Sequence, residues 1–176
     1  MIKLAKTRDE YHEMRRCFLP GTIRLVIVAE SPPISGLYFY DVTGKSTEPL
    51  FSALMKQLPF SPTSKENGLK EFQKRGWILV DATYEPVNRR DTSNRVRNNV
   101  ILKDYERLKS DLKSLLSDRS TPLILIKTNV CRILEPKLVE DGYNVLNRGC
   151  VVPFPSSVQQ TNFDRHFGEI LKSAGL

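Results

Sequence analysis

The sequence is poor in the residues that usually bind metal ions or form disulfide frameworks. Its 176 residues include only three cysteines, Cys17, Cys131 and Cys150, with no close pair among them, whereas small disulfide-stabilised domains carry even, regularly spaced sets. The only histidines are His12 and His166, and neither belongs to a local motif with a cysteine. Zinc sites, iron–sulfur clusters and cysteine nucleophiles therefore lack their usual groups, and we expect no metal and no cofactor.

Long apolar runs and the common enzyme motifs are also missing. No segment approaches the roughly 18 consecutive apolar residues that a membrane-spanning helix needs. Residues 1–10 are charged and lack the apolar centre of a signal peptide, so we expect a cytoplasmic protein without a membrane partner. The sequence contains no P-loop, no Gly-x-Gly-x-x-Gly, no Gly-x-Ser-x-Gly and no His-Glu-x-x-His, which excludes the most common enzyme classes.

The chain has a surplus of positive charge. It carries 27 lysines and arginines against 20 acidic residues, a formal net charge of +7, with 40% hydrophobic and 27% charged residues. These fractions and the length are typical of one folded domain, and we expect a single monomeric domain over residues 1–176. The surplus favours a polyanionic partner such as DNA, with a basic surface that has no such partner as the alternative.

Apolar runs alternate with amphipathic segments along the chain. Three nearly continuous apolar runs, 23–29, 77–80 and 122–126, predict strands that are buried on both faces. Segment 150–153 is predicted as a fourth strand or as the approach to a loop, and segment 143–146 as a minor strand. Helical periodicity predicts the helices 7–18, 47–58, 68–74, 99–116, 129–141 and 160–174. This alternation predicts an α/β fold with three α/β/α layers around a central four-stranded, mainly parallel sheet.

Polar segments follow the predicted strands, and ligands of open α/β folds bind outside the carboxyl ends of the strands. We therefore expect the functional residues in the segments 30–41, 81–97, 127–129 and 154–160. The segments are far apart in the sequence, but a parallel sheet brings the carboxyl ends of its strands to one edge. A binding site built from several of these segments is the expected arrangement.

The first polar segment holds two carboxylates and three consecutive aromatic residues. Glu30 directly follows a buried strand, and Asp41 ends the segment. Either carboxylate can position a water molecule or stabilise a cationic sugar as a glycosidic bond breaks, and the alternative for Glu30 is that it caps a neighbouring element. Tyr38, Phe39 and Tyr40 suit stacking on a nucleobase, or packing in the core.

The later polar segments offer a carboxylate, arginines and hydroxyl groups. Asp81 follows the second strand and is expected to face the same cleft as Glu30, with a capping role as the alternative. Ser156 and Ser157 precede the last helix, where they can bind a phosphate or cap that helix. The long irregular segment 81–98 carries four arginines that suit phosphate contacts, or that are merely solvated: Arg89, Arg90, Arg95 and Arg97.

The order and spacing of these segments resemble the uracil-DNA glycosylase superfamily over about residues 23–171. Residues 29–33 read Ala-Glu-Ser-Pro-Pro, where family members carry Gly-Glu-Ala-Pro-Gly. Residues 81–89 look similar to the family's Asn-led motif that ends in Pro-x-Asn-Arg, and residues 154–156 read Phe-Pro-Ser in place of His-Pro-Ser. The resemblance implies the family's α/β/α fold and hydrolysis of the N-glycosidic bond of a damaged or deaminated base in DNA.

The resemblance also implies roles for single residues. Phe39, or Tyr40, matches the aromatic residue that stacks on the base, and Ser31 stands where some members have a water-activating Asp. Phe154 replaces the His that stabilises the departing base, and a phenyl ring donates no hydrogen bond to a developing oxyanion. Asp81 replaces the Asn that reads uracil. An ionised Asp only accepts hydrogen bonds, so it suits the amino group of cytosine or adenine better than uracil.

We therefore hypothesise that a flipped or single-stranded base stacks on Phe39 and meets Asp81. Glu30 would orient water or support the sugar cation, and Ser156 and Ser157 would hold the backbone phosphate. Two alternatives stay open. One is a non-catalytic DNA-binding module of the same fold, which the loss of the histidine favours. The other is a hydrolase that acts on free nucleosides or nucleotides.

Overall fold

The structure is a computed structural model that describes residues 6–89 and 91–176. Arg90, one of the predicted phosphate-binding arginines, lies outside the described residues. Within them the chain forms seven helices and four strands, which alternate along the sequence. The prediction of an α/β fold is therefore confirmed.

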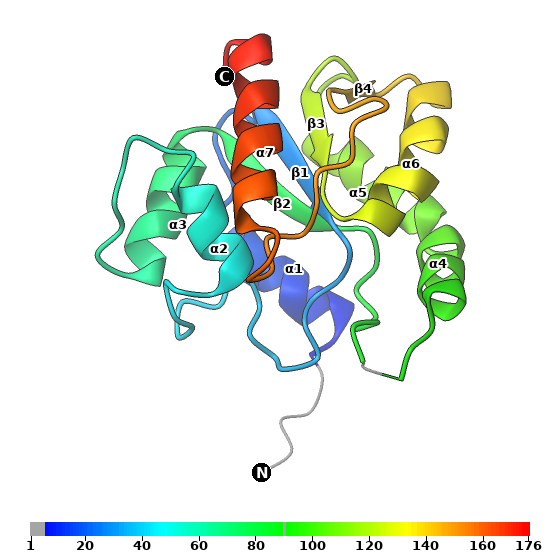
Figure 1. Cartoon of the computed structure of the whole chain (residues 1–176), viewed down its shortest axis with the longest axis horizontal. Helices are drawn as coiled ribbons and strands as arrows, with labels where there is room; N and C mark the ends of the chain where they lie inside the picture. Colours follow the sequence, from blue (N-terminus) through cyan, green and yellow to red (C-terminus); the bar gives the residue numbers. More distant parts are fainter. Residues whose placement is uncertain (1–5, 90) are drawn as a thin grey trace.

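The four strands form one parallel sheet in the order β2-β1-β3-β4 (Figure 1). Every residue of the two longest strands is buried, because their apolar side chains meet a helical layer on each face of the sheet. The register pairs Ala29 with Asp81, so β1 and β2 end side by side. The strands are β1 (Leu25–Ala29), β2 (Trp77–Asp81), β3 (Pro122–Leu125) and β4 (Asn144–Val145).

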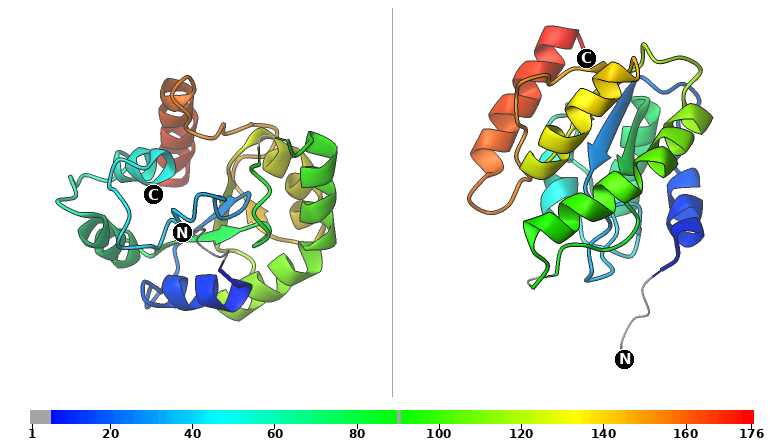
Figure 2. Two further views of the ribbon diagram at one scale, coloured as in Figure 1. Left: turned by 90° about the horizontal axis from the view of Figure 1, so that it is seen from below. Right: turned by 90° about the vertical axis from the view of Figure 1, so that its right-hand side faces the viewer.

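The two faces of the sheet carry separate apolar cores. Leu25 and Ile27 pack with residues of α2, α3 and α7, whereas Val26 and Val28 pack with residues of α4, α5 and α6. Figures 1 and 2 show these helices as layers on opposite sides of the strands, which gives the three-layer arrangement. The helices are α1 (Arg8–Arg16), α2 (Pro49–Met55), α3 (Lys65–Lys74), α4 (Asn94–Lys103), α5 (Tyr105–Leu115), α6 (Thr128–Glu140) and α7 (Gln160–Ala174).

The fourth strand, β4, lies within segment 143–146, which was predicted as a minor strand. It does not lie at 150–153, where the sequence favoured it. Only Val152 of that segment pairs, through a single bridge to Ile126. The reason is Asn147, whose buried side chain accepts a hydrogen bond from the Leu125 backbone N–H at 3.0 Å and donates one to the Leu125 carbonyl at 2.9 Å. The amide thus satisfies the backbone groups of Leu125 to which a longer edge strand would bond.

The single helix predicted at 99–116 is two helices, and the irregular segment before it is shorter than predicted. α4 begins at Asn94 because the Ser93 side chain caps it by accepting from the Val96 N–H. The break between α4 and α5 lies at Asp104, whose carboxylate accepts a 2.6 Å hydrogen bond from the Thr83 hydroxyl. This bond ties the break to the loop that follows β2, and so fixes α4 beside that loop.

The chain leaves β1 and β3 in opposite directions. After β1 it crosses one face through α2 and α3 to reach β2, and after β3 it crosses the other face through α6 to reach β4. Neighbouring strands with opposite exits leave a crevice between their first loops, and this crevice is the usual ligand site of open α/β sheets. Among the described residues, no helix is both long and apolar enough to cross a membrane.

Candidate functional site

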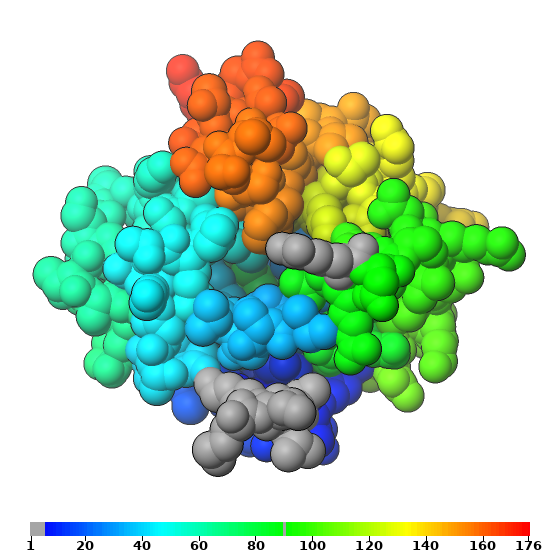
Figure 3. Space-filling view, turned by 60° about the horizontal axis from the view of Figure 1, so that its bottom comes forward, coloured from blue at the N-terminus to red at the C-terminus, as the bar shows by residue number. Residues whose placement is uncertain are grey.

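A cavity of about 260 Å³ lies at the carboxyl ends of β1, β2 and β3. In Figure 3 the surface is hollowed where the segments around 31–40, 46–52 and 152–158 meet. The cavity therefore occupies the crevice that the strand order predicts. Six of the residues singled out in the sequence line it: Glu30, Ser31, Tyr38, Phe39, Asp81 and Phe154.

Phe39 serves both as a wall of this cavity and as part of the core. Its ring packs against Phe51 and Phe72, with ring centroids 5.8 Å and 5.2 Å away, and the residue is 6% exposed. The base-stacking and core-packing interpretations of Phe39 are thus compatible in this position. Leu79 and Ile126 add apolar wall from β2 and the end of β3, so a flat apolar ligand would find dispersion contacts there.

Glu30 ends β1 and is held by two donors from the start of α6. Its Oε1 accepts from the Lys127 ammonium at 2.5 Å, and its Oε2 accepts from the Asn129 amide at 2.5 Å. The Glu30 side chain is 6% exposed, whereas Lys127 is 28% exposed and lines the cavity. Because each carboxylate oxygen accepts a hydrogen bond from a neighbour at the start of α6, Glu30 is held in place as a fixed negative charge.

The backbone of Lys127 is in an unusual conformation. Its φ is +86°, and among the described residues it is the one non-glycine with a positive φ. Such a backbone costs of order 1–3 kcal/mol and persists where surrounding contacts hold it. Here the contacts are the ion pair with Glu30 and the backbone hydrogen bond from the Lys127 N–H to the Val152 carbonyl.

Asp81, the last residue of β2, is a buried carboxyl group without a cation of its own. It is 3% exposed, and its Oδ2 has no hydrogen-bond partner among the described residues. Burial raises its pKa from 3.8 to about 8, the Arg15 charge opposes that rise, and the charges of Asp111 and Glu30 add to it. A second orphaned polar atom, the Tyr38 hydroxyl oxygen, belongs to another residue of the same cavity wall.

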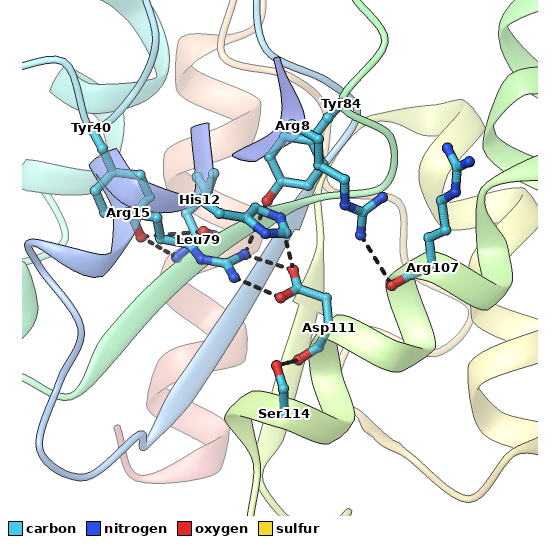
Figure 4. Close-up of polar contacts among 9 residues, drawn as sticks. All are labelled: Arg8, His12, Arg15, Tyr40, Leu79, Tyr84, Arg107, Asp111 and Ser114. Atoms are coloured by element: carbon cyan, nitrogen blue, oxygen red, sulfur yellow. Dashed lines mark hydrogen bonds and ion pairs between the residues drawn. The ribbon is translucent and has the colours of Figure 1, made fainter. Parts of the chain in front are cut away.

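The guanidinium of Arg15, whose charge acts on Asp81, makes its hydrogen bonds to other residues (Figure 4). It forms a bidentate ion pair with Asp111 at 2.7 Å and 2.6 Å, and it donates to the Tyr84 hydroxyl at 3.0 Å. Both members of the pair are buried. The pair joins α1 to α5.

The other aromatic candidate, Tyr40, is a core residue outside the cavity wall. Its hydroxyl accepts from the Leu79 N–H at 2.7 Å and donates to the Leu79 carbonyl at 3.2 Å (Figure 4). Its ring stacks on Phe18, with centroids 6.2 Å apart. Asp41 also lies outside the wall, and its Oδ1 accepts from the Thr43 N–H and hydroxyl. The sequence offered Phe39 or Tyr40 for stacking on the base, and Glu30 or Asp41 as the catalytic carboxylate. The cavity wall includes Phe39 and Glu30.

The serines before the last helix lie outside the cavity wall as well. Ser156 is partly buried and Ser157 is exposed, and neither caps α7, whose N-cap residue is Gln159 without a side-chain bond. The capping interpretation of the serines is therefore wrong. Phe154 is 39% exposed and lines the cavity.

The described arginines of the segment after β2 differ in their exposure to solvent. Arg89 and Arg95 are exposed, and Arg97 is partly buried. Arg97 donates to the Arg89 carbonyl at 3.2 Å, which links the first turn of α4 to the preceding loop. Arg95 and Arg97 lie on α4 and not on an irregular segment. Asn88 of the same loop reaches the cavity wall.

Sequence reasoning missed several polar residues of the site. Lys127 and Asn129 fall in a segment that was expected to matter, but nothing in the sequence pairs them with Glu30, about a hundred residues earlier. Cysteine chemistry was set aside because neither histidine belongs to a local motif with a cysteine, whereas in the fold Cys150 Sγ lies 3.6 Å from His166 Nδ1. Both residues are partly exposed and lie away from the cavity wall.

The chain was compared with known protein families and with curated proteins. No family model matches it. No curated protein matches it either.

Proposed function

We propose that the cavity receives a nucleobase of DNA and that the protein acts as a DNA glycosylase-like hydrolase of the N-glycosidic bond. The observation that carries this proposal is the buried Asp81 carboxyl group in an aromatic-walled cavity at the carboxyl ends of parallel strands. A polar group that is buried without a partner costs free energy unless a ligand supplies the missing bond. The +7 net charge supports DNA as the source of the base.

The size and walls of the cavity suit one small ring system. Its volume of about 260 Å³ lies just below the roughly 300–1,000 Å³ of pockets for drug-sized ligands. A base in this space would stack on Phe39 and place its polar edge at Asp81, with Leu79 against the ring. A base within a duplex cannot reach such a site, so it would enter from a single strand or after flipping out.

The residues around the cavity supply charges of both signs for breaking a glycosidic bond. The transition state carries positive charge on the sugar and negative charge on the departing base. The Glu30 carboxylate, fixed by its two donors, would stabilise the sugar cation as the bond to the base breaks and water attacks the anomeric carbon. One proton of this water would end on the departing base. The Lys127 ammonium, which lines the cavity, would stabilise the departing base in place of the histidine that Phe154 replaces.

A non-catalytic DNA-binding module is the second candidate, and one observation favours it. Both oxygens of Glu30 already accept a hydrogen bond, from Lys127 or Asn129, and these donors compete with a catalytic water for the same carboxylate. In this case a base would still enter the cavity, but it would not be released. Hydrolysis of free nucleosides is a third candidate, which the basic surface does not favour.

A base-release assay separates these candidates. Oligonucleotides that contain uracil, hypoxanthine or an alkylated base are incubated with the protein, and the free base is measured. The proposal predicts release by the wild-type protein and a loss of about 100-fold or more in the Glu30→Gln variant. Glu85→Gln, at an exposed carboxylate of the loop after β2, is the matched control and should retain full activity.

The remaining outcomes of this assay are also informative. Salt-dependent DNA binding without release of any base would favour the non-catalytic module. Release from free nucleosides but not from DNA would favour the third candidate. If the protein neither binds DNA nor releases any base at low salt, the proposed function is overturned.

A further inference from the structure

The environment of Asp81 determines the form in which this residue meets a ligand. Its side chain is 3% exposed, and Oδ2 has no donor among the described residues. Leu79 and Phe39 contribute apolar wall to the same cavity. An ionised carboxylate in these surroundings would lose its hydration without gaining hydrogen bonds in return, which is the costly case for a buried charge.

The charged groups around Asp81 do not offset this cost. Two other buried carboxylates act on Asp81, and each has its own cation: Glu30 pairs with Lys127, and Asp111 pairs with Arg15. An ionised Asp81 would therefore add a third negative charge beside two cations that are already paired. The titratable and charged groups that act on it or lie around it are Tyr11, Arg15, Glu30, Tyr38, Tyr40, Tyr84, Asp111 and Lys127.

We propose that Asp81 binds the base as a neutral carboxylic acid, which makes it a protonation-dependent base-binding residue. The proposal rests on the proposed function of the cavity as a base-binding site. A protonated carboxyl group donates one hydrogen bond and accepts another. It therefore complements a ring edge that carries an acceptor next to an N–H, as the nucleobases uracil, hypoxanthine, cytosine and adenine all do.

Loss of the proton removes this complementarity. The ionised carboxylate only accepts, so it repels the ring acceptor, such as O4 of uracil or N3 of cytosine, to which the neutral group donates. The ionised form is the one on which the sequence-based expectation for Asp81 was founded, whereas burial favours the neutral form near neutral pH. The cavity would thus bind a base less tightly as the pH rises through the titration of one side chain.

The first part of the test needs no ligand. Infrared difference spectra between the wild-type protein and the Asp81→Asn variant should show the carbonyl band of a protonated carboxyl group at about pH 6. The band should disappear as the pH is raised to about 9.5. Absence of the band at about pH 6 overturns the proposal even if the protein binds DNA, so its failure is distinct from failure of the proposed function.

The second part measures the contribution of the base to binding. Single-stranded oligonucleotides that carry either one central uracil or an abasic site at that position are bound at about pH 6 and about pH 9. The wild-type protein should favour the oligonucleotide with uracil by at least about fivefold at the lower pH and lose that preference at the higher pH. Asp81→Asn, whose amide keeps one donor and one acceptor, corrects for ionisation of the ring and should show no further change.

A preference that is the same at both pH values in the wild-type protein overturns the proposal. So does a change of equal size in the Asp81→Asn variant, because it would come from the ring. If neither oligonucleotide binds, the proposed function and the assignment of a base to Asp81 fail together. The infrared band then still decides whether the residue is protonated.

Discussion

At the scale of single residues, three buried carboxyl groups lie close to one another and differ in their partners. Glu30 is bonded to Lys127 and Asn129, and Asp111 is bonded to Arg15. Asp81 lines the cavity, and its Oδ2 has no hydrogen-bond partner among the described residues. Since a buried charge is tolerated when it is paired, the two paired groups are suited to carry charge, and Asp81 is suited to hold a proton.

The proton on Asp81 makes the stability of the protein depend on pH. Between the unfolded value of 3.8 and the folded pKa of about 8, the native protein keeps a proton that the unfolded chain releases. The free energy of unfolding therefore falls as pH rises, by up to about 1.4 kcal/mol per pH unit from this group. Asp81→Asn removes this dependence, so the variant gains stability relative to the wild type with rising pH. Urea denaturation over a pH series measures it, and a difference that stays constant across the window contradicts it.

The backbone of Lys127 gives a second prediction at this scale. Ala and Gly substitutions both remove the ion pair with Glu30, but only Gly relieves the positive φ of 86°. We expect Lys127→Gly to be more stable than Lys127→Ala by about 1 kcal/mol or more. Lys70 is an exposed residue inside α3, and there the Lys70→Ala variant should be more stable than the Lys70→Gly variant by about 1 kcal/mol. Thermal denaturation of the four variants tests this, and the same order at both positions would rule it out.

The sequence predicts single residues well where they follow directly from a strand. Glu30 and Asp81 end buried apolar runs, and the register of two parallel strands brings them to one edge. The pairing of Arg15 with Asp111 joins residues 96 positions apart, and the strained Lys127 depends on contacts from β1 and from Val152. No local pattern encodes such contacts, so these parts of the site become visible only in the folded chain.

At the scale of the elements, one buried ion pair fixes α1 against α5. Arg15→Met leaves Asp111 buried without its partner and should cost about 3–5 kcal/mol, measured by urea denaturation. The next residue, Arg16, pairs with Glu13 on the exposed surface, and Arg16→Met should change stability by less than about 0.5 kcal/mol. The double variant Arg15→Met/Asp111→Leu should recover most of the loss. Equal losses at positions 15 and 16 would show that the pair does not hold α1.

The elements themselves were predictable where apolar periodicity is strong. The last helix begins and ends at the predicted residues, and the three long strands lie within two residues of their predicted limits. The fourth strand was misplaced because only two residues of it pair, while the Asn147 side chain occupies the backbone groups next to it. The break at Asp104 was missed because it depends on a bond to Thr83 and not on the helical pattern.

At the scale of the whole molecule, the charge surplus predicts salt-dependent binding to DNA. If Arg89 and Arg95 contact phosphates, Arg89→Gln and Arg95→Gln should each weaken binding at low salt. Each should also reduce the slope of log affinity against log salt concentration by about 1. Arg75 is exposed just before β2, at the opposite end of the strands, and Arg75→Gln is the matched control with an unchanged slope. Equal slope changes for all three variants would show that DNA does not bind specifically at Arg89 and Arg95.

The central claim is that a base of DNA enters the cavity, and photochemical crosslinking tests it most directly. An oligonucleotide with a single 5-iodouracil is irradiated in complex with the protein, and the crosslinked residue is mapped by mass spectrometry. Because this base crosslinks to aromatic rings on which it stacks, we predict attachment at Phe39 or Phe154, which line the cavity. Crosslinks found only at residues outside the cavity wall would contradict the account.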